Sequence, residues 1–138
     1  MLVREIMANN VKALERNSTM QDAALAMKNN DIGAVPVVEN NEVLGILTDR
    51  DLVIRGLAEN RNSETTRIND VMSNGKIVFC NENDEVENAA KIMEENQVRR
   101  LVVKDENNKL SGILSMGDIS LRADEKLAGE IVRKVSKH

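Results

Sequence analysis

The chain has 138 residues, enough for one compact unit of ordinary domain size. Its 23 acidic residues outnumber its 19 Lys and Arg residues, so its charge does not indicate a nucleic-acid-binding protein. One Phe, with no Trp or Tyr, leaves no aromatic platform for stacking the bases of a single strand. One Cys, Cys80, and one His, His138, exclude an intramolecular disulfide, a Cys/His zinc cluster and catalysis by an internal His.

No stretch of the sequence indicates insertion in a membrane. The longest apolar runs, Ala34 to Val38 and Ile77 to Cys80, are far shorter than the roughly 20 residues of a membrane span. The first residues lack the apolar core of a signal peptide. Together with the unpaired Cys80, these features predict a cytoplasmic protein.

The first half of the chain begins with a short apolar segment, Val11 to Leu14, which predicts a strand. Ser18 and Gln21 have the spacing of a capping box and predict the start of a helix. Apolar residues at 20, 23, 24 and 27 follow the helical period and form its predicted buried face.

Two short strands, Ala34 to Val38 and Val43 to Leu47, are predicted next. Asn40 and Asn41 mark the turn between them, because Asn tolerates a left-handed backbone. A second helix is predicted to open near Asp49, and the polar stretch 59–67 then connects the two halves.

The second half repeats this order. Its predicted elements are a strand at 77–80, a helix capped by Asp84 and Glu87 with apolar residues at 86, 89, 90 and 93, strands at 101–103 and 110–114, and a helix opening near Gly117. A final helix after Asp124 is predicted to serve in packing or dimer formation.

Four segments match between the halves in the same order, which indicates an internal duplication. The predicted fold is α/β of the α+β type, with two β-α-β-β-α repeats whose sheets pack about a pseudo-twofold axis. The repeats span 1–60 and 68–123, with a linker at 61–67 and a C-terminal helix at 124–138. A half of this size buries only a small fraction of its surface, so we expect it to be marginally stable alone.

The duplicated pattern resembles a pair of CBS (cystathionine-β-synthase) domains, also called a Bateman module. The most specific motif, Gly-apolar-apolar-Thr/Ser-x-x-Asp, occurs at Gly45–Asp51 and again at Gly112–Asp118. Ile32–Pro36 resembles the motif that precedes the family's strand, whereas the second repeat has Val102 where Pro is usual. The whole chain is similar to stand-alone two-repeat prokaryotic CBS proteins, including hypoxic response proteins.

The motif allows two interpretations. In the first, the hydroxyls of Thr48 and Ser115 and the carboxylates of Asp51 and Asp118 only cap helices. In the second, the hydroxyls contact a phosphate and the carboxylates hold the two hydroxyls of a ribose. The resemblance implies the second role, with an adenosyl ligand in the cleft between the repeats: AMP, ADP, ATP or S-adenosylmethionine.

The resemblance also implies that Arg99 and Arg100 reach phosphates, with Arg50 as a weaker candidate; alternatively, Arg99 and Arg100 are solvated surface residues. Ile32, Val98 and Ala13 are either walls of an adenine site or ordinary core residues. Only the second repeat carries the Arg pair, so we predict two inequivalent sites, one of which binds nucleotide more tightly.

These features predict a regulatory sensor that signals by conformational change and requires no cofactor or metal. The alternative is a ligand-free structural or adaptor protein with the same fold. No phosphate loop or nucleophile paired with a base is present, so no catalytic residue and no enzymatic activity are predicted. The family resemblance implies a homodimer, and a sensor requires a further protein partner, which the sequence does not identify. Membrane and nucleic-acid partners are not expected.

Overall fold

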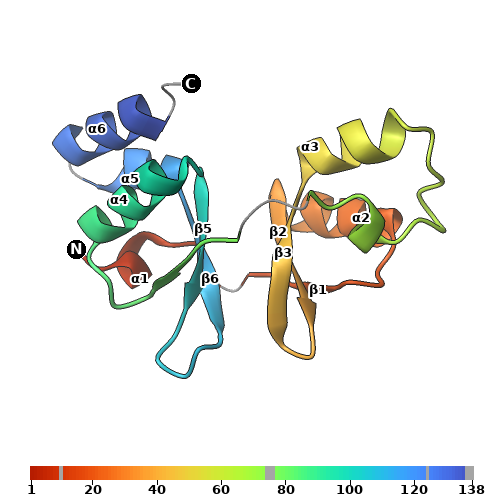
Figure 1. Cartoon of the computed structure of the whole chain (residues 1–138), viewed down its shortest axis with the longest axis horizontal. Helices are drawn as coiled ribbons and strands as arrows, with labels where there is room; N and C mark the ends of the chain where they lie inside the picture. Colours follow the sequence, from red (N-terminus) through yellow and green to blue (C-terminus); the bar gives the residue numbers. More distant parts are fainter. Residues whose placement is uncertain (10, 74–76, 124, 136–138) are drawn as a thin grey trace. The chain divides into compact units, whose positions relative to one another are not determined.

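The computed structural model describes residues 1–9, 11–73, 77–123 and 125–135, which form two compact units (Figure 1). Unit 1 comprises Met1–Val11 and Val78–His138, and unit 2 comprises Lys12–Ile77. Each unit contains one three-stranded mixed sheet with helices, which confirms the predicted α/β class and the duplicated arrangement. In the described part of the chain, no helix has the length and apolar character needed to span a membrane.

Unit 2 is built around the sheet β1-β2-β3. Its elements are β1 (Leu14–Glu15), α2 (Met20–Asn30), β2 (Ala34–Glu39), β3 (Glu42–Thr48), α3 (Asp49–Asp51), the π-helical η1 (Leu52–Leu57) and the 3₁₀ turn η2 (Ile68–Asp70). β1 pairs with β2 in parallel, and β2 pairs with β3 antiparallel. Asn40 and Asn41 both have positive φ, which confirms the predicted turn.

The predicted cap of α2 is one residue out of register. Thr19, not Ser18, is the N-cap: the Asp22 N–H donates to Thr19 Oγ1 at 3.1 Å, and the Thr19 N–H donates to Asp22 Oδ2 at 3.0 Å. These hydrogen bonds hold the pKa of the Asp22 carboxyl below its usual value.

The connection predicted as a linker is bonded to α2. The Met20 N–H donates to the Thr66 carbonyl at 3.0 Å, and the Gln21 N–H donates to the Ser63 carbonyl at 2.9 Å. These bonds satisfy two of the N–H groups that a helix start leaves free. The polar stretch therefore completes the cap of the helix that precedes it.

Unit 1 is built around the sheet β4-β5-β6. Its elements are α1 (Val3–Ile6), β4 (Phe79–Asn81), α4 (Val86–Asn96), β5 (Arg100–Lys104), β6 (Leu110–Ser115), α5 (Met116–Arg122) and α6 (Glu125–Val135). The predicted cap of α4 is wrong: Glu85 is the N-cap and makes no side-chain bond to the helix. The Asp84 carboxylate instead accepts from the Asn81 N–H at 2.9 Å.

The predicted apolar face is fully buried on α4 but only partly on α2. On α4, Val86, Ala89, Ala90 and Met93 are all buried. On α2, Ala24 is exposed and Ala26 is buried in its place. Ala90, the repeat equivalent of Ala24, is among the residues on α4 that face α6. The described residues of unit 2 form no helix in the place of α6.

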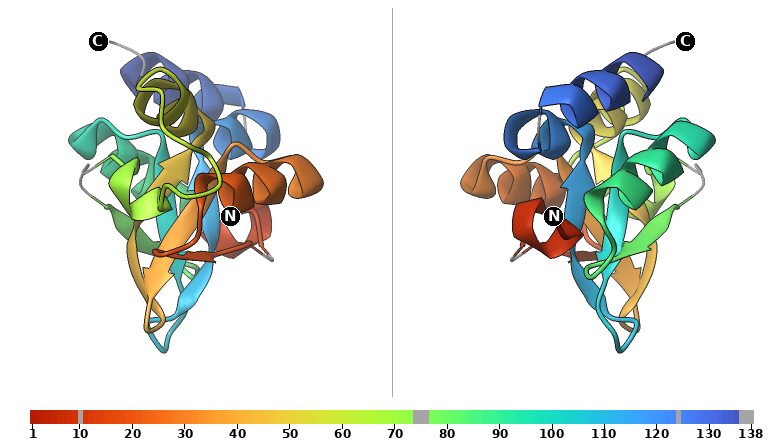
Figure 2. Two further views of the ribbon diagram at one scale, coloured as in Figure 1. Left: turned by 90° about the vertical axis from the view of Figure 1, so that its right-hand side faces the viewer. Right: turned by 90° about the vertical axis from the view of Figure 1, so that its left-hand side faces the viewer.

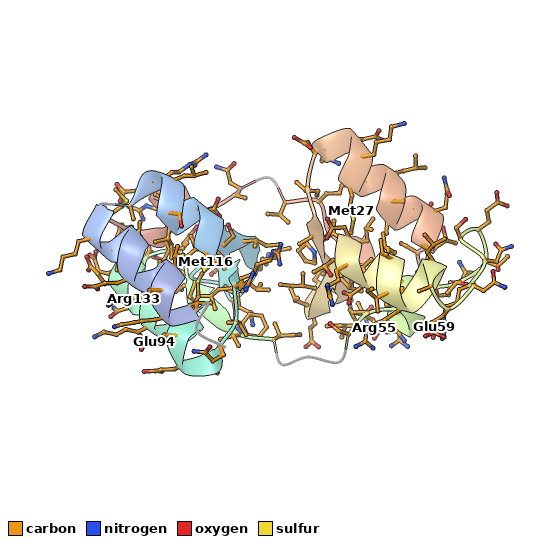
Figure 3. All side chains as sticks on the ribbon, turned by 90° about the horizontal axis from the view of Figure 1, so that it is seen from above. Met27, Arg55, Glu59, Glu94, Met116 and Arg133 are labelled. Carbon is orange, nitrogen blue, oxygen red and sulfur yellow. The ribbon has the colours of Figure 1, made fainter. Side chains whose placement is uncertain are left out.

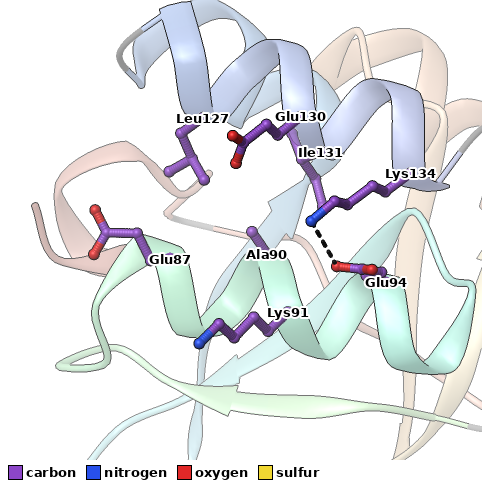
Figure 4. Close-up of a pocket in the computed structure, with 8 residues that line it drawn as sticks. All are labelled: Glu87, Ala90, Lys91, Glu94, Leu127, Glu130, Ile131 and Lys134. Atoms are coloured by element: carbon purple, nitrogen blue, oxygen red, sulfur yellow. Dashed lines mark ion pairs between the residues drawn. The ribbon is translucent and has the colours of Figure 1, made fainter.

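Helix α6 lies along α4 and α5 within unit 1 (Figure 2). Ala128, Ile131 and Val135 point into the unit and are buried. A hollow of about 140 Å³ remains between α4 and α6, where Lys134 Nζ lies 3.6 Å from Glu94 Oε2 (Figure 4). Helix α6 thus acts as a packing element that completes the core of unit 1.

The first segment of each repeat packs into the unit formed by the other repeat. The Val3 N–H donates to the Asp84 carbonyl at 2.9 Å, and Val3 and Ile6 are buried in the core of unit 1. In the equivalent arrangement, the Ile68 N–H donates to the Ser18 carbonyl at 2.8 Å, and Ile68 is buried in the core of unit 2. The sequence repeats and the compact units therefore divide the chain differently.

Candidate functional site

In unit 2, the predicted motif lies where β3 ends and α3 begins. The Thr48 N–H donates to Asp51 Oδ2 at 3.0 Å, and the Asp51 N–H donates to Thr48 Oγ1 at 3.1 Å. Asp51 is 7% exposed and is the one buried charged side chain among the described residues. Its second oxygen, Oδ1, lies 3.8 Å from Arg55 Nε, which offsets part of its charge.

Unit 1 repeats this geometry where β6 meets α5. The Ser115 N–H donates to Asp118 Oδ2 at 2.9 Å, and the Asp118 N–H donates to Ser115 Oγ at 3.0 Å. Both motifs are therefore complete capping boxes, so the first interpretation of these residues is realised in the structure.

The caps leave hydrogen-bonding capacity unused. Each hydroxyl accepts a bond through its oxygen, and neither hydroxyl proton has an acceptor among the contacts of the described residues. Asp118 uses only Oδ2 in its cap, so Oδ1 can accept from a ribose hydroxyl. A cap and a ligand contact are therefore compatible in the same residues.

The residues before β2 and β5 are adjacent to the motifs. The Asp49 N–H donates to the Gly33 carbonyl at 2.9 Å, and Ala34 pairs with Thr48. In unit 1 the Met116 N–H donates to the Arg99 carbonyl at 2.8 Å.

Because Arg100 pairs with Ser115 across the sheet, the structure brings Arg99 and Arg100 to the start of α5. Both side chains are exposed, and neither forms an ion pair within the described residues. Glu94, which lies near them in sequence, pairs with Lys134 instead. Two arginines without an ion pair among the described residues thus join the motif through their backbones, Arg100 opposite Ser115 and Arg99 bonded to Met116, and their positive charge suits an anionic ligand.

Arg50 lies within α3 and is also exposed, but two carboxylates flank it in the chain. Its own N–H donates to Asp49 Oδ1 at 2.8 Å. Sequence reasoning overlooked Asp49, which places a negative charge at the first position of α3. Comparing the repeats would have revealed it, because Met116 occupies the equivalent place in unit 1.

Of the three predicted apolar wall residues, Ile32 and Val98 lie near the motifs and Ala13 does not. Ile32 and Val98 are half-buried, pack against the cores of their own units and immediately precede Gly33 and Arg99. Ala13 is half-buried before β1, which pairs with β2 at Val37 and Val38 rather than at the end of β2 next to the motif.

Cys80 is buried in unit 1, and burial raises the pKa of its thiol to about 12. The unfolded thiol has a pKa near ~8.5, so the thiolate is strongly suppressed in the fold. We expect negligible alkylation by iodoacetamide at pH 8 in buffer and rapid alkylation in denaturant.

The same pKa shift predicts that Cys80 has no effect on stability below about pH 8 and lowers stability as the pH rises above the unfolded thiol's pKa of ~8.5. The unfolded chain then loses a proton that the folded chain retains. Rapid alkylation of Cys80 by iodoacetamide in the native protein at pH 8 would contradict a buried, unreactive thiol.

The described residues contain no group of three or more His, Cys, Asp or Glu side chains placed to hold a metal ion. The sequence profile of the CBS domain matches residues 3–57 and 68–124. The chain belongs to the CBS domain family.

Its CBS relatives include proteins of similar length. The CBS domain-containing protein YhcV of Bacillus subtilis is 37% identical over 135 residues, covering 97% of this chain and 94% of that protein. Hypoxic response protein 1 of Mycobacterium tuberculosis is 33% identical over 133 residues, covering 96% and 92%. These shares leave little of either relative for a separate catalytic domain.

Solved CBS structures share the fold. Hypoxic response protein I, with two coordinated zinc ions, superposes with a TM-score of 0.75 at 32% identity, covering 90% of this chain and all of that one. The CBS pair of MJ0100, bound to 5′-methylthioadenosine and S-adenosyl-L-methionine, gives 0.74 at 24% identity, covering 88% and 94%. PAE2072 of Pyrobaculum aerophilum, complexed with AMP, gives 0.76 at 19% identity, covering 96% and 98%.

Proposed function

We propose that this CBS protein is a regulatory module that binds an adenosyl ligand, foremost AMP, ADP or ATP, and signals by a change of conformation. The observation that carries the proposal is the paired motif of unit 1. Ser115 and Asp118 keep a donor and an acceptor free, directly beside the uncompensated Arg99 and Arg100. MJ0100 and PAE2072, which share the fold, bind adenosyl compounds, and this supports the choice of ligand.

Each group has a defined task in this proposal. The Asp118 carboxylate accepts from the two ribose hydroxyls, and the charge of the acceptor strengthens these bonds. The Ser115 hydroxyl donates to a phosphate oxygen while its own oxygen continues to cap α5. Arg99 and Arg100 supply the positive charge that the acidic chain otherwise lacks near this point.

Signalling requires two states between which the ligand discriminates, because a ligand of equal affinity for both shifts neither. We propose that a second copy of the chain takes part. Exposed apolar side chains on η1 of unit 2, at Val53, Ile54 and Leu57, form the proposed contact surface. Light scattering after gel filtration tests this, and a monomer that persists at high concentration would contradict it.

A ligand-free adaptor is the second candidate, and the complete capping boxes favour it, because they explain Thr48, Asp51, Ser115 and Asp118 without any ligand. The two candidates differ in how a charge-removing substitution behaves. If the motif only caps, substitution alters stability alone.

For the regulatory module, Asp118→Asn should weaken AMP and ATP binding about ten- to hundredfold, because a charged acceptor is replaced by an amide. Titration calorimetry of the folded variant measures this loss. The matched control is Asp22→Asn, since Asp22 forms the same reciprocal cap with Thr19 on α2 but lies outside the motif.

We expect Asp22→Asn to cost similar stability and leave nucleotide affinity within about twofold, since only the cap is lost. If wild-type protein binds no AMP, ATP or S-adenosylmethionine and both variants change only the melting temperature, the adaptor interpretation stands.

A further inference from the structure

The two motifs are alike in backbone geometry but differ in charge. In unit 1, Arg99 precedes β5 and Arg100 is its first residue. The start of α5 carries the uncharged Met116, which is labelled in Figure 3. In unit 2 the equivalent places hold Gly33 and Ala34, which are uncharged, and the acidic Asp49. At these places unit 1 therefore carries two positive charges, and unit 2 carries one negative charge. The exposed Arg50, whose place in unit 1 is taken by Gly117, offsets the charge of Asp49 but leaves the start of α3 without the net positive charge of unit 1.

Local contacts maintain this difference. The Asp49 carboxylate accepts only the backbone N–H of Arg50 among the contacts of the described residues, so its charge is not neutralised by a cation. A Cβ on Gly33 would lie 3.1 Å from Asp49 Oδ2, so this carboxylate lies against the backbone just before β2. A phosphate placed in unit 2 as in unit 1 would meet a carboxylate instead of a guanidinium pair.

We infer that the two motifs select different classes of adenosyl ligand, an inference that rests on the proposed function. The motif of unit 1 takes adenosyl ligands with a phosphate at the 5′ position. The motif of unit 2 takes adenosyl ligands without phosphate, whose 5′ group is neutral or cationic, such as a thioether or a sulfonium. Like charges near each other oppose binding, and opposite charges favour it, so each motif rejects the other class.

One glycine at each motif allows each unit to be followed separately. Glycine amides are few in this chain, with 7 in total. Gly117 lies in the motif of unit 1, and Gly33 lies beside the motif of unit 2, where its carbonyl accepts from the Asp49 N–H. In a titration of ¹⁵N-labelled protein followed by amide correlation spectra, ATP should shift Gly117 at lower concentration than Gly33. Methylthioadenosine, which has no phosphate, should shift Gly33 at lower concentration than Gly117.

Removing the guanidinium pair tests the origin of the preference. The double variant Arg99→Gln with Arg100→Gln should lower the ATP affinity reported by the Gly117 signal about tenfold. Its affinity for methylthioadenosine should stay within about twofold of the unmodified protein's. Arg61→Gln with Arg133→Gln is the control, since both residues are exposed, lie outside the motifs and carry the same total charge. This control should leave both affinities within about twofold if the effect is local.

Removing the acidic group tests the other motif. Asp49→Asn keeps the Oδ1 acceptor that bonds the Arg50 N–H, so α3 should keep its start. This variant should raise ATP affinity at Gly33 at least about threefold without raising that for methylthioadenosine.

Three results would overturn the inference while leaving adenosyl binding intact. They are ATP shifting Gly33 first, equal losses of ATP and methylthioadenosine affinity in the double Arg variant, and equal effects of the two double variants. If no adenosyl compound shifts either glycine, the proposed function itself fails, and the inference fails with it.

Discussion

Replacing Gly112 by Ala is expected to destabilise unit 1 by about 2 kcal/mol, the range seen for overpacked interiors. A Cβ at this position would lie 2.4 Å from the carbonyl oxygen of Ala8, closer than any real contact. Ala8 cannot move freely, because it exchanges two backbone hydrogen bonds with Ile113, of 2.9 and 3.1 Å. The new methyl group therefore forces apart the N-terminal segment and β6.

Gly45→Ala is the matched control, because Gly45 is the first residue of the same motif in unit 2. There a Cβ would meet Met72 Sδ at 2.8 Å, and a thioether side chain can rotate away. The loss should stay below about 1 kcal/mol. Urea unfolding followed by circular dichroism measures both variants. Equal losses at the two glycines would show that the rigid carbonyl of Ala8 is not the cause.

Replacing Ile131 by Ala should cost about 3 kcal/mol of unfolding free energy, as buried Ile-to-Ala changes commonly do. Ile131 lies on α6, is 2% exposed and packs into the core of unit 1 with Ile119 and Met93. Its truncation would leave a cavity under α6 that the ion pair between Lys134 and Glu94, which is half exposed, cannot offset.

The neighbouring Val132 provides a control on the same helix, since it is 37% exposed. Val132→Ala should cost less than about 1 kcal/mol, because folding removes less apolar area from water at Val132 than at Ile131. Limited proteolysis should release α6 from the Ile131 variant and spare the Val132 variant. A stable, protease-resistant Ile131→Ala protein would mean that unit 1 does not depend on α6.

Features repeated in the sequence were predicted well, because local chemistry determines them. The periodic residues Val86, Ala89 and Met93 place α4 on its core, and Asn40 and Asn41 form the tight turn. The two motifs were located correctly at the junctions of a strand and a helix, since hydroxyl and carboxylate at this spacing cap a helix whether or not a ligand binds.

Features that depend on distant segments were not predictable from the same patterns. The sequence predicts Ser18 as the cap of α2, one residue before the true cap Thr19, and it does not show that the carbonyls of Ser63 and Thr66 accept from the next two N–H groups. The periodicity predicts that Ala24 is buried, but it is exposed, and the described residues of unit 2 form no helix in the place of α6. Periodicity reports which face of a helix is apolar and does not report what will cover it.

The first segment of each repeat packs with the other repeat, so unit 2 is inserted in the sequence of unit 1. Unit 2 is one uninterrupted stretch, Lys12–Ile77, placed between the two parts of unit 1. A cut between the repeats would separate Val3 and Ile6 from the rest of the unit 1 core. It would also separate Ile68 from the rest of the unit 2 core. The fragment Lys12–Ile77 therefore keeps every residue of the unit 2 core, whereas neither half of the duplicated sequence keeps a whole core.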